Sequence, residues 1–320
     1  MSDEIEPPDI RDSDGEVAKE KIKLQFHWYL SIFFVIYYCS YVIPGIVFME
    51  YVILVFIPLF LRIDNLFAVF TNLDSLIAFL ALPLVLIVSY LIHLFLVGLA
   101  SRIIWRYTEK ISPSKDGIIP RNIPSKTANL YHIRSFMIKY GKNAFMKGIF
   151  PWLANWFFNF VGTSVIKKGS TLEESVVTDR NVNVGKNCYI GVNSALSSHF
   201  VEGVFGNIVY FEIKLGENVT LGGFNNIAPG CELRDNSYLL PLAAATKHNL
   251  LKGNNYYFGM PLRRIFKKKI INYLKVSEEN LVQAEELRVK QENAKLERIK
   301  KEAEKNEKKN IKSKGVRENG

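Results

Sequence analysis

A histidine and a carboxylate lie three residues apart in segment 197–202, which reads Ser-Ser-His-Phe-Val-Glu. A histidine can act as a general base toward a hydroxyl or an amine, because its pKa lies close to neutral pH. A neighbouring carboxylate can orient its ring. We therefore predict His199 as a catalytic base and Glu202 as its orienting partner. The alternative for His199 is an ordinary histidine at a turn.

The element that must position His199 is a six-residue repeat between residues 166 and 243. Its first position is aliphatic in all but one case: Ile166, Leu172, Thr178, Val184, Ile190, Leu196, Leu215, Leu221, Ile227, Leu233 and Leu239. Four residues further on lies a mostly small set: Ser170, Val176, Val182, Cys188, Ser194, Val219, Asn225, Cys231, Ser237 and Ala243. This period fits neither a helix nor a flat strand. It predicts a parallel β-helix of roughly four coils, with three hexads to a coil.

Turn residues support the same register. Glycines follow the aliphatic position at Gly185, Gly191, Gly216 and Gly222. Asparagines take the fourth position at Asn187, Asn193, Asn218 and Asn236. We expect both sets at tight corners, the glycines because they tolerate positive φ and the asparagines because they favour turns. A β-sandwich would instead need strands at spacings of about 8 to 12 residues.

The repeat is interrupted where His199 lies. It resumes at Leu215, nineteen residues after Leu196 rather than the eighteen of a full coil. An insertion that is out of phase must bulge outward from a regular coil. Catalytic residues often lie on such loops, because a rigid scaffold holds them in place.

Two apolar stretches, 26–61 and 76–100, precede the repeat, and both exceed the ~20 residues that a membrane span requires. We predict two spans within residues 25–101, the first long and kinked near Pro44. A helical hairpin turning at Pro44-Gly45 is the alternative. Basic residues flank both ends of this region, at Lys19, Lys21, Lys23, Arg102, Arg106 and Lys110. The positive-inside rule then places the N-terminus, the β-helix and the C-terminal tail on the cytoplasmic side of the plasma membrane.

The remaining chain divides by composition. Residues 1–24 carry eight acidic and four basic residues and are predicted to be a disordered tail. Residues 102–164 form a linker, in which segment 132–160 either lies on the membrane surface or caps the first coil. Residues 165–262 are the repeat domain.

The C-terminal tail, residues 263–320, contains 18 basic and 10 acidic residues. A charged helix is expected from about 277 to 309, either solvated or in a weak coiled coil. Its basic excess suits anionic membrane lipid. No nucleic-acid recognition motif accompanies the charge, so we expect no nucleic-acid partner.

Metal and thiol chemistry are not indicated. The chain has neither HExxH nor paired CxxC, and no metal cofactor is predicted. A zinc site of three histidines is excluded, because the repeat supplies only His199 and His248 lies past its last clean hexad. Cys39, Cys188 and Cys231 are interpreted as core residues in a reducing compartment.

A hexapeptide repeat with one histidine at an irregular coil resembles the left-handed β-helix acyltransferases. The ending of the repeat is similar too, with Pro229-Gly230, Pro241, Gly253 and the closing segment Phe258-Gly259-Met260-Pro261-Leu262. The resemblance implies a left-handed coil and His199 as the base that deprotonates the acceptor. It implies acyl-CoA, or another phosphopantetheine thioester, as the donor, approached by Gly259 and Pro261. It also implies a homotrimer with residues 201–211 near the subunit boundary.

Further features narrow the resemblance to one group within this family. They are the two spans, Gly162-Thr163, His199 with Glu202, and Tyr257-Phe258-Gly259-Met260-Pro261. Over roughly residues 80–265 the chain is similar to the membrane-bound terminal domain of ε-poly-lysine-synthetase-type nonribosomal peptide synthetases. Those proteins join amino acids delivered as carrier-protein thioesters. Here one unit stands without an adenylation or carrier domain. Where the family commonly has a longer run after the histidine, this chain has Gly203-Val204-Phe205-Gly206.

The resemblance therefore implies a membrane-bound acyltransferase. Its donor would be CoA or an acyl-carrier protein, and its acceptor a hydroxyl or an amine. A non-catalytic β-helix scaffold anchored to membrane lipid is the alternative. A His199 side chain inside the coil would favour the scaffold, and one in a groove facing a neighbouring subunit would favour the enzyme.

Overall fold

The computed structural model describes residues 26–61, 65, 67–120, 125–177, 180–203 and 206–265, together with scattered positions between 277 and 297. It divides into two units, Met1–Arg264 and Ile265–Gly320. The predicted N-terminal tail, residues 1–24, lies outside the described residues.

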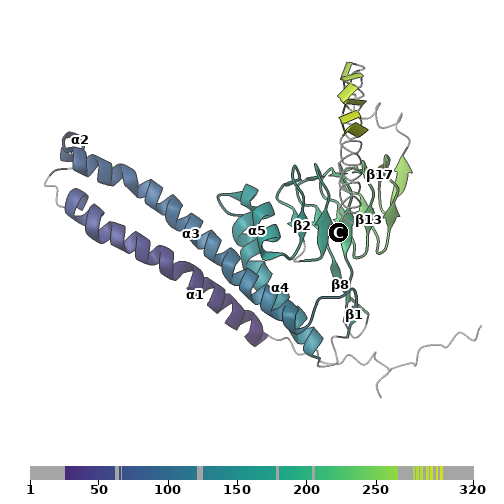
Figure 1. The fold of residues 1–320 in the computed structure, drawn as a ribbon, viewed down its shortest axis with the longest axis horizontal. Helices are drawn as coiled ribbons and strands as arrows, with labels where there is room; N and C mark the ends of the chain where they lie inside the picture. Colours follow the sequence, from purple (N-terminus) through teal and green to yellow (C-terminus); the bar gives the residue numbers. More distant parts are fainter. Residues whose placement is uncertain are drawn as a thin grey trace, which may run out of the picture. The chain divides into compact units, whose positions relative to one another are not determined.

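The first unit begins with helices. These are α1 (Phe26–Tyr51), its π-helical continuation η1 (Val52–Leu61), α2 (Ala68–Thr71), α3 (Leu73–Ile111), α4 (Lys126–Met146), η2 (Pro151–Leu153) and α5 (Ala154–Val161). Helices α1 and α3 lie side by side, and α4 packs against both (Figure 1). Helix α1 continues through Pro44, so the hairpin alternative is wrong. The departure from α-helical geometry begins at Val52 and includes Pro58, whose ring removes one backbone donor.

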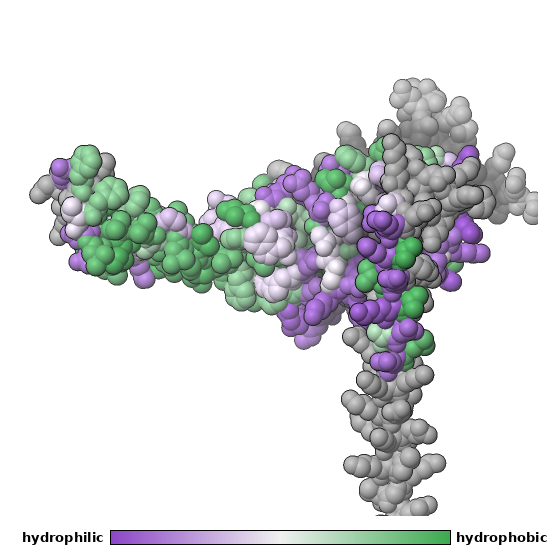
Figure 2. Space-filling view, turned by 90° about the horizontal axis from the view of Figure 1, so that it is seen from above, coloured by the Kyte–Doolittle hydropathy of each residue, from purple (hydrophilic) through white to green (hydrophobic). Residues whose placement is uncertain are grey.

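Two of these helices are long and apolar enough to cross a membrane, as predicted: 35 residues over His27–Leu61 and 39 residues over Leu73–Ile111. At 1.5 Å per residue they are ~52 and ~58 Å long, more than the ~30 Å of a bilayer's hydrocarbon core. Only 11% of the apolar window of each helix is buried, unlike the core helix of a soluble protein. Hydrophobic residues accordingly cover the surface of this pair (Figure 2, left).

Three parallel sheets follow. The first sheet contains β2 (Val165–Ile166), β5 (Val182–Val184), β10 (Ile213–Leu215), β13 (Glu232–Leu233) and β16 (Leu250–Leu251). The second sheet contains β3 (Thr171–Leu172), β6 (Tyr189–Ile190), β11 (Thr220–Leu221), β14 (Tyr238–Leu239), β17 (Tyr256–Phe258) and β18 (Arg263–Ile265). The third sheet contains β4 (Val176–Val177), β7 (Ala195–Leu196), β12 (Asn226–Ile227) and β15 (Ala244–Ala245).

The chain visits the three sheets in turn and then starts again one rung further on (Figure 1). Leu221 pairs with Leu239, and Ile227 with Ala245, in parallel register and eighteen residues apart. Three hexads therefore make one coil, as the repeat predicts. The handedness of the coil stays a prediction.

The aliphatic position of the hexad forms the core of this coil. Val184, Ile190, Leu196, Leu221 and the following members are almost fully buried. The small position is buried with them: Cys188, Ser194, Val219, Asn225, Cys231, Ser237 and Ala243 are at most 1% exposed. The pattern also continues beyond residue 243, through the buried residues Ala245, Leu251 and Tyr257.

The φ angles at the corners confirm that the asparagines occupy turns and show that the glycines are needed for a different reason. Asn187, Asn193, Asn218 and Asn236 all have φ between 53° and 57°. The four predicted glycines do not have positive φ. They are needed because the next rung passes too close: a Cβ on Gly185 would lie 2.1 Å from the carbonyl oxygen of Gly216, and one on Gly191 would lie 2.6 Å from that of Leu221.

Helix α5 closes the first coil. Phe157 and Phe158 are fully buried and belong to the same core as the strands. Asn159 both donates to the carbonyl of Ile166 and accepts from its amide, at 2.8 and 2.9 Å. These are the contacts that the capping interpretation of segment 132–160 expects. Trp152, 68% exposed beside this cap, leaves the membrane-surface interpretation as a prediction.

The second unit is described only at scattered positions. All the positions described between 279 and 297 are helical, which agrees with the predicted charged helix over that span.

Candidate functional site

An antiparallel hairpin leaves the coil between the third and first sheets. Its strands are β8 (His199–Glu202) and β9 (Asn207–Tyr210), and β1 (Gly117–Ile119) pairs with the outer side of β9. We call this hairpin the arm. Its base is closed by the amide of Phe211, which donates to the carbonyl of Ser198 at 2.9 Å. The out-of-phase insertion predicted from the repeat is therefore a separate structural element, placed at the interruption.

The arm also contacts a later coil at the same corner. The ring of Phe211 meets that of His248 edge-on, with centroids 4.5 Å apart. Glu202 forms an ion pair with Lys247. Both contacts reach the corner that follows β15, which lies two rungs of the third sheet beyond β7.

His199 lies outside the aliphatic core, on the first residue of β8. It pairs across the hairpin with Tyr210. Its ring meets the ring of Tyr131 from α4 edge-on, with centroids 5.7 Å apart and planes at 80°. The side chain is half-buried, and its Nδ1 atom is buried. The ring is thus held between the arm and α4.

A buried arginine lies behind these two tyrosines. Arg180 is 1% exposed, and its guanidinium carbon lies 4.2 Å from the centroid of the Tyr131 ring and 5.1 Å from that of Tyr210. Tyr131 and Tyr210 also meet each other edge-on. Burial raises the pKa of Tyr210 to about 12, although the charge of Arg180 acts in the opposite direction. At neutral pH the Tyr210 phenol is therefore neutral.

Glu202 and His199 are not brought together. Side chains alternate between the two faces of a strand, so residues three apart point to opposite sides. Glu202 instead pairs with Lys247. The prediction that Glu202 orients the ring assumed a loop, in which a spacing of three can converge.

Gly259 and Pro261 lie at a different corner of the coil, between the second and third sheets. Gly259 has φ +84°, and its carbonyl accepts from the amide of Ala244 at 3.2 Å. This contact places it three rungs of the third sheet beyond β7, ~14 Å along the axis at 4.8 Å per rung. Within one chain, the width of the third sheet also separates Gly259 from His199.

Sequence reasoning missed Tyr131, Arg180 and Tyr210. The six-residue period marks residues that point into the coil, whereas Arg180 belongs to a corner and Tyr131 to a helix. Only Tyr210 carried a signal, since it lies in the segment that breaks the repeat.

The three cysteines differ in exposure. Cys188 and Cys231 are buried, and burial raises the pKa of both thiols. Cys39 is exposed on α1, so its assignment to the core is wrong. Within the residues that the structure describes, no three His, Cys, Asp or Glu side chains cluster as a metal site would require.

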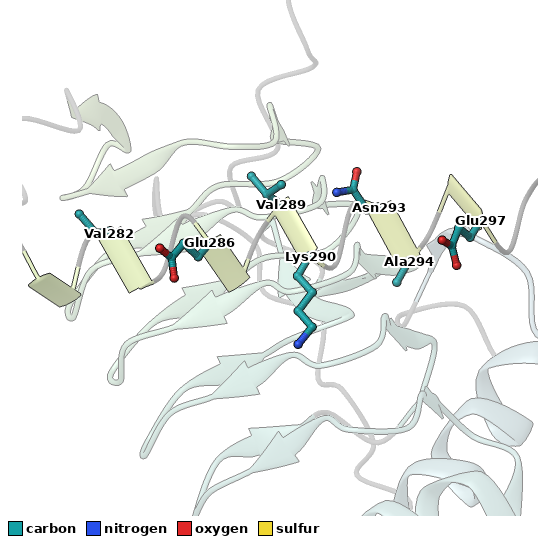
Figure 3. A pocket seen from close by; sticks show the side chains of 7 residues that line it. All are labelled: Val282, Glu286, Val289, Lys290, Asn293, Ala294 and Glu297. Atoms are coloured by element: carbon teal, nitrogen blue, oxygen red, sulfur yellow. The ribbon is translucent and has the colours of Figure 1, made fainter.

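A cavity of about 760 Å³ lies in the second unit (Figure 3). Its lining residues are Val282, Glu286, Val289, Lys290, Asn293, Ala294 and Glu297. Their spacing of three and four residues places them on one face of one helix. One face of a single helix cannot enclose a ligand, so this hollow is not a candidate active site.

Comparison with known proteins finds no matching family model and no matching curated protein. Solved structures similar to part of the chain include a hexapeptide-repeat acetyltransferase of Vibrio cholerae, at 15% identity and a TM-score of 0.31, which covers 33% of this chain. A maltose O-acetyltransferase of Clostridium difficile 630 has 23% identity and a TM-score of 0.22 over 31% of the chain. A galactoside acetyltransferase in complex with coenzyme A has 18% identity and a TM-score of 0.29 over 54%.

These similarities are partial on both sides. The chain spans 64%, 68% and 81% of the three structures respectively. The matched proteins are hexapeptide-repeat acetyltransferases or other acetyltransferases. At TM-scores below 0.5 the likeness carries no argument about the activity or assembly of this chain.

Proposed function

We propose that this chain is a membrane-bound acyltransferase of the hexapeptide-repeat type. It would move an acyl or aminoacyl group from a phosphopantetheine thioester to a hydroxyl or an amine. The observation that supports this best is the placement of His199. Over the described part of the coil, an arm interrupts the regular repeat, and the first residue of that arm is a half-buried histidine held by an aromatic side chain from another element.

The chemistry asked of His199 is general-base catalysis. Its Nδ1 atom is buried, so Nε2 is the nitrogen that would take the proton from the acceptor. The acceptor oxygen or nitrogen then attacks the thioester carbonyl and a C–O or C–N bond forms. The C–S bond breaks, and the departing thiolate takes up the proton that the imidazolium received from the acceptor. No metal enters this scheme.

Glu202 has a different role in this proposal from the one that the sequence indicated. Its ion pair with Lys247 ties the tip of β8 to the corner after β15. The contact restrains the arm that carries His199 rather than the ring itself. Tyr131 and Tyr210 take over the contact with the histidine.

Gly259 and Pro261 are the proposed donor-approach residues, for acyl-CoA or an acyl-carrier protein. Because they lie at another corner of the same coil, a site that uses both them and His199 needs a second copy of the chain. Contacts between unlike surfaces form a ring when the rotation between copies closes, and we propose that it closes here in a homotrimer. Residues 201–211 would lie near the boundary between neighbouring copies.

The helical pair supports the membrane part of the proposal, because its apolar surface is exposed over a length that exceeds a bilayer. We propose that two helices span the plasma membrane in contact with lipid. The N-terminus, the coil and the basic tail would be cytoplasmic, following the flanking basic residues. Nucleic acid is not a proposed partner.

The experiment that tests this function is a donor screen. Protein purified in detergent is incubated with acetyl-CoA, longer acyl-CoAs and aminoacyl carrier-protein thioesters, each with hydroxyl and amine acceptors, and thiol release is followed. Release that depends on both the acceptor and the protein is expected for at least one donor. If no thioester binds or reacts, the scaffold interpretation replaces the enzyme.

A further inference from the structure

Arg180 is a buried charge that no carboxylate of the described residues contacts. Within the described residues its guanidinium forms no ion pair, and its Nε atom has no hydrogen-bond partner there. Its other donors reach the carbonyl of Tyr131 at 3.3 Å and the Oγ of Ser135 at 3.2 Å, both on α4. Desolvating a cation costs several kcal/mol unless it is well compensated. An apolar residue would fill the same space at lower cost.

The surroundings of Arg180 increase that cost. Arg134, also buried on α4, uses its donors on Thr108, Ser114 and the carboxylate of Glu109. Burial lowers the pKa of Arg134, and the charge of Arg180 acts in the same direction. The two cations therefore repel each other. Packing alone gives no reason for a second arginine here.

Arg180 connects the three elements that meet at His199. Its backbone carbonyl accepts from the Oγ of Ser198 at 2.6 Å, at the base of the arm. Its guanidinium faces the rings of Tyr210 on the arm and Tyr131 on α4. The Tyr131 ring in turn meets the ring of His199. The arginine is the only described side chain that contacts both tyrosines as a cation over a ring.

We propose that Arg180 is a positioning residue, which fixes the Tyr131 ring and through it the orientation of the His199 imidazole. This inference rests on the proposed acyl transfer. It also predicts that helices α1, α3 and α4 determine the orientation of the His199 ring. Helix α4, which carries Tyr131, packs on α1 and α3, and its contacts with α1 include Tyr29 with Phe136 and Phe33 with Tyr140.

Four variants test the inference. Arg180→Met removes the charge and the fork of donors, and Tyr131→Leu removes the ring on which His199 rests. Arg180→Lys keeps the charge without the planar fork. Tyr131→Phe keeps the ring and is the matched control. We expect kcat to fall on the order of 10²-fold in Arg180→Met and Tyr131→Leu, the usual effect of a ~1 Å misplacement, with KM nearly unchanged. Tyr131→Phe should lose less than Tyr131→Leu, because it keeps the ring that meets His199, and Arg180→Lys should lie between Arg180→Met and the parent protein.

A second readout does not need activity. The rate at which diethyl pyrocarbonate modifies His199, followed by mass spectrometry on the detergent-solubilised chain, should rise several-fold in Arg180→Met and Tyr131→Leu. The rate at His248 should stay unchanged. An unchanged rate at His199 in both variants would overturn the positioning role. If Arg180→Met does not fold, Arg180→Lys and Tyr131→Leu decide in its place.

The two failures are distinguishable. A faster modification of His199 without any acyl transfer in the parent protein would refute the proposed function, while the contact chain through Tyr131 would stand. A normal acyl transfer with unchanged kcat in Arg180→Met and Tyr131→Leu would refute the positioning role alone.

Discussion

Phe224 and Leu242 occupy turn positions that asparagine occupies elsewhere in the same coil. Replacing both residues with asparagine tests whether the corner on which they lie forms the interface between copies of the chain. Their φ angles are 52° and 65°, in the left-handed region. The equivalent positions at the corner between the first and second sheets are asparagine in four coils, at Asn187, Asn218, Asn236 and Asn254, and glycine in the first coil, at Gly169. Two bulky apolar residues therefore stand in a strained conformation, 57% and 69% exposed.

The expected effect on a single chain is small. Left-handed backbone costs a bulky residue about 1 kcal/mol more than it costs asparagine, so each substitution relieves roughly that amount. Full burial of a leucine or phenylalanine contributes about 1.5–3 kcal/mol. Since each side chain is less than half buried, each substitution loses about 1 kcal/mol of packing. The two terms nearly cancel.

The expected effect on a trimer is large. If the exposed parts of both side chains are buried against a neighbour, the substitutions lose about 1–2 kcal/mol each, or ~3 kcal/mol per contact. A ring of three contacts would lose ~9 kcal/mol. We expect Phe224→Asn/Leu242→Asn to dissociate in detergent at concentrations where the parent protein is trimeric, with little change in thermal unfolding of the coil.

Multi-angle light scattering across a dilution series measures this directly. Asn236→Leu is the matched control: it places leucine at the same turn position on a polar corner and breaks the hydrogen bonds of Asn236 with Asn218 and Asn254. It should lower the unfolding temperature and leave assembly intact. A double variant that assembles as well as the parent protein would refute the interface, and a monodisperse monomeric parent would refute the trimer.

Three further predictions follow from the structure. Ile190 is fully buried in the coil, so Ile190→Asp should abolish folding. The loss would be seen as the disappearance of the monodisperse peak in size-exclusion chromatography and of the β-sheet circular dichroism signal. A folded variant would contradict the inward register of the hexad. The pKa of the Tyr210 phenol is raised to about 12 from an ordinary 10.0, so the stability that its neutral form contributes is complete below pH 10 and is lost as the pH rises to 12. Chemical unfolding should show this loss as ~2–3 kcal/mol in the parent protein and not in Tyr210→Phe. Equal alkaline sensitivity in both proteins would refute the prediction. Cysteines introduced near Ser13 and Asn310 should react with impermeant maleimide only after cells are permeabilised, and labelling in intact cells would contradict the proposed topology. The experiment uses a Cys39→Ser background, in which the buried Cys188 and Cys231 do not react.

The parallel coil could be predicted because its signal is periodic. An aliphatic residue every six positions, from Ile166 to Leu239, marks the inward direction at most strands; the exception is β4, where Val177 rather than Thr178 pairs with Leu196. The interruption after Leu196 marked the arm for the same reason. The glycines were placed correctly but explained wrongly, because sequence cannot distinguish a positive φ from the close passage of the next rung.

The surroundings of His199 could not be predicted, because they depend on contacts between distant segments. β1 pairs with β9 across about ninety residues, and Tyr131 approaches His199 from a helix sixty-eight residues earlier. Neither pairing leaves a repeat in the sequence. The position of Glu202 relative to His199 could not be predicted for a local reason, since residues three apart converge in a loop and diverge in the strand that forms.

The most direct test of the account is single-turnover acyl transfer by His199→Ala, with His248→Ala as the control at the same corner of the coil. The account predicts a rate lower by ~10²–10⁴-fold in His199→Ala, the usual contribution of a positioned base. The assembly of that variant should be unchanged and its unfolding temperature should fall only slightly, because the half-buried ring also packs against Tyr131. His248→Ala should keep the parent rate. An undiminished rate in His199→Ala would contradict the assignment of the base and the function built on it.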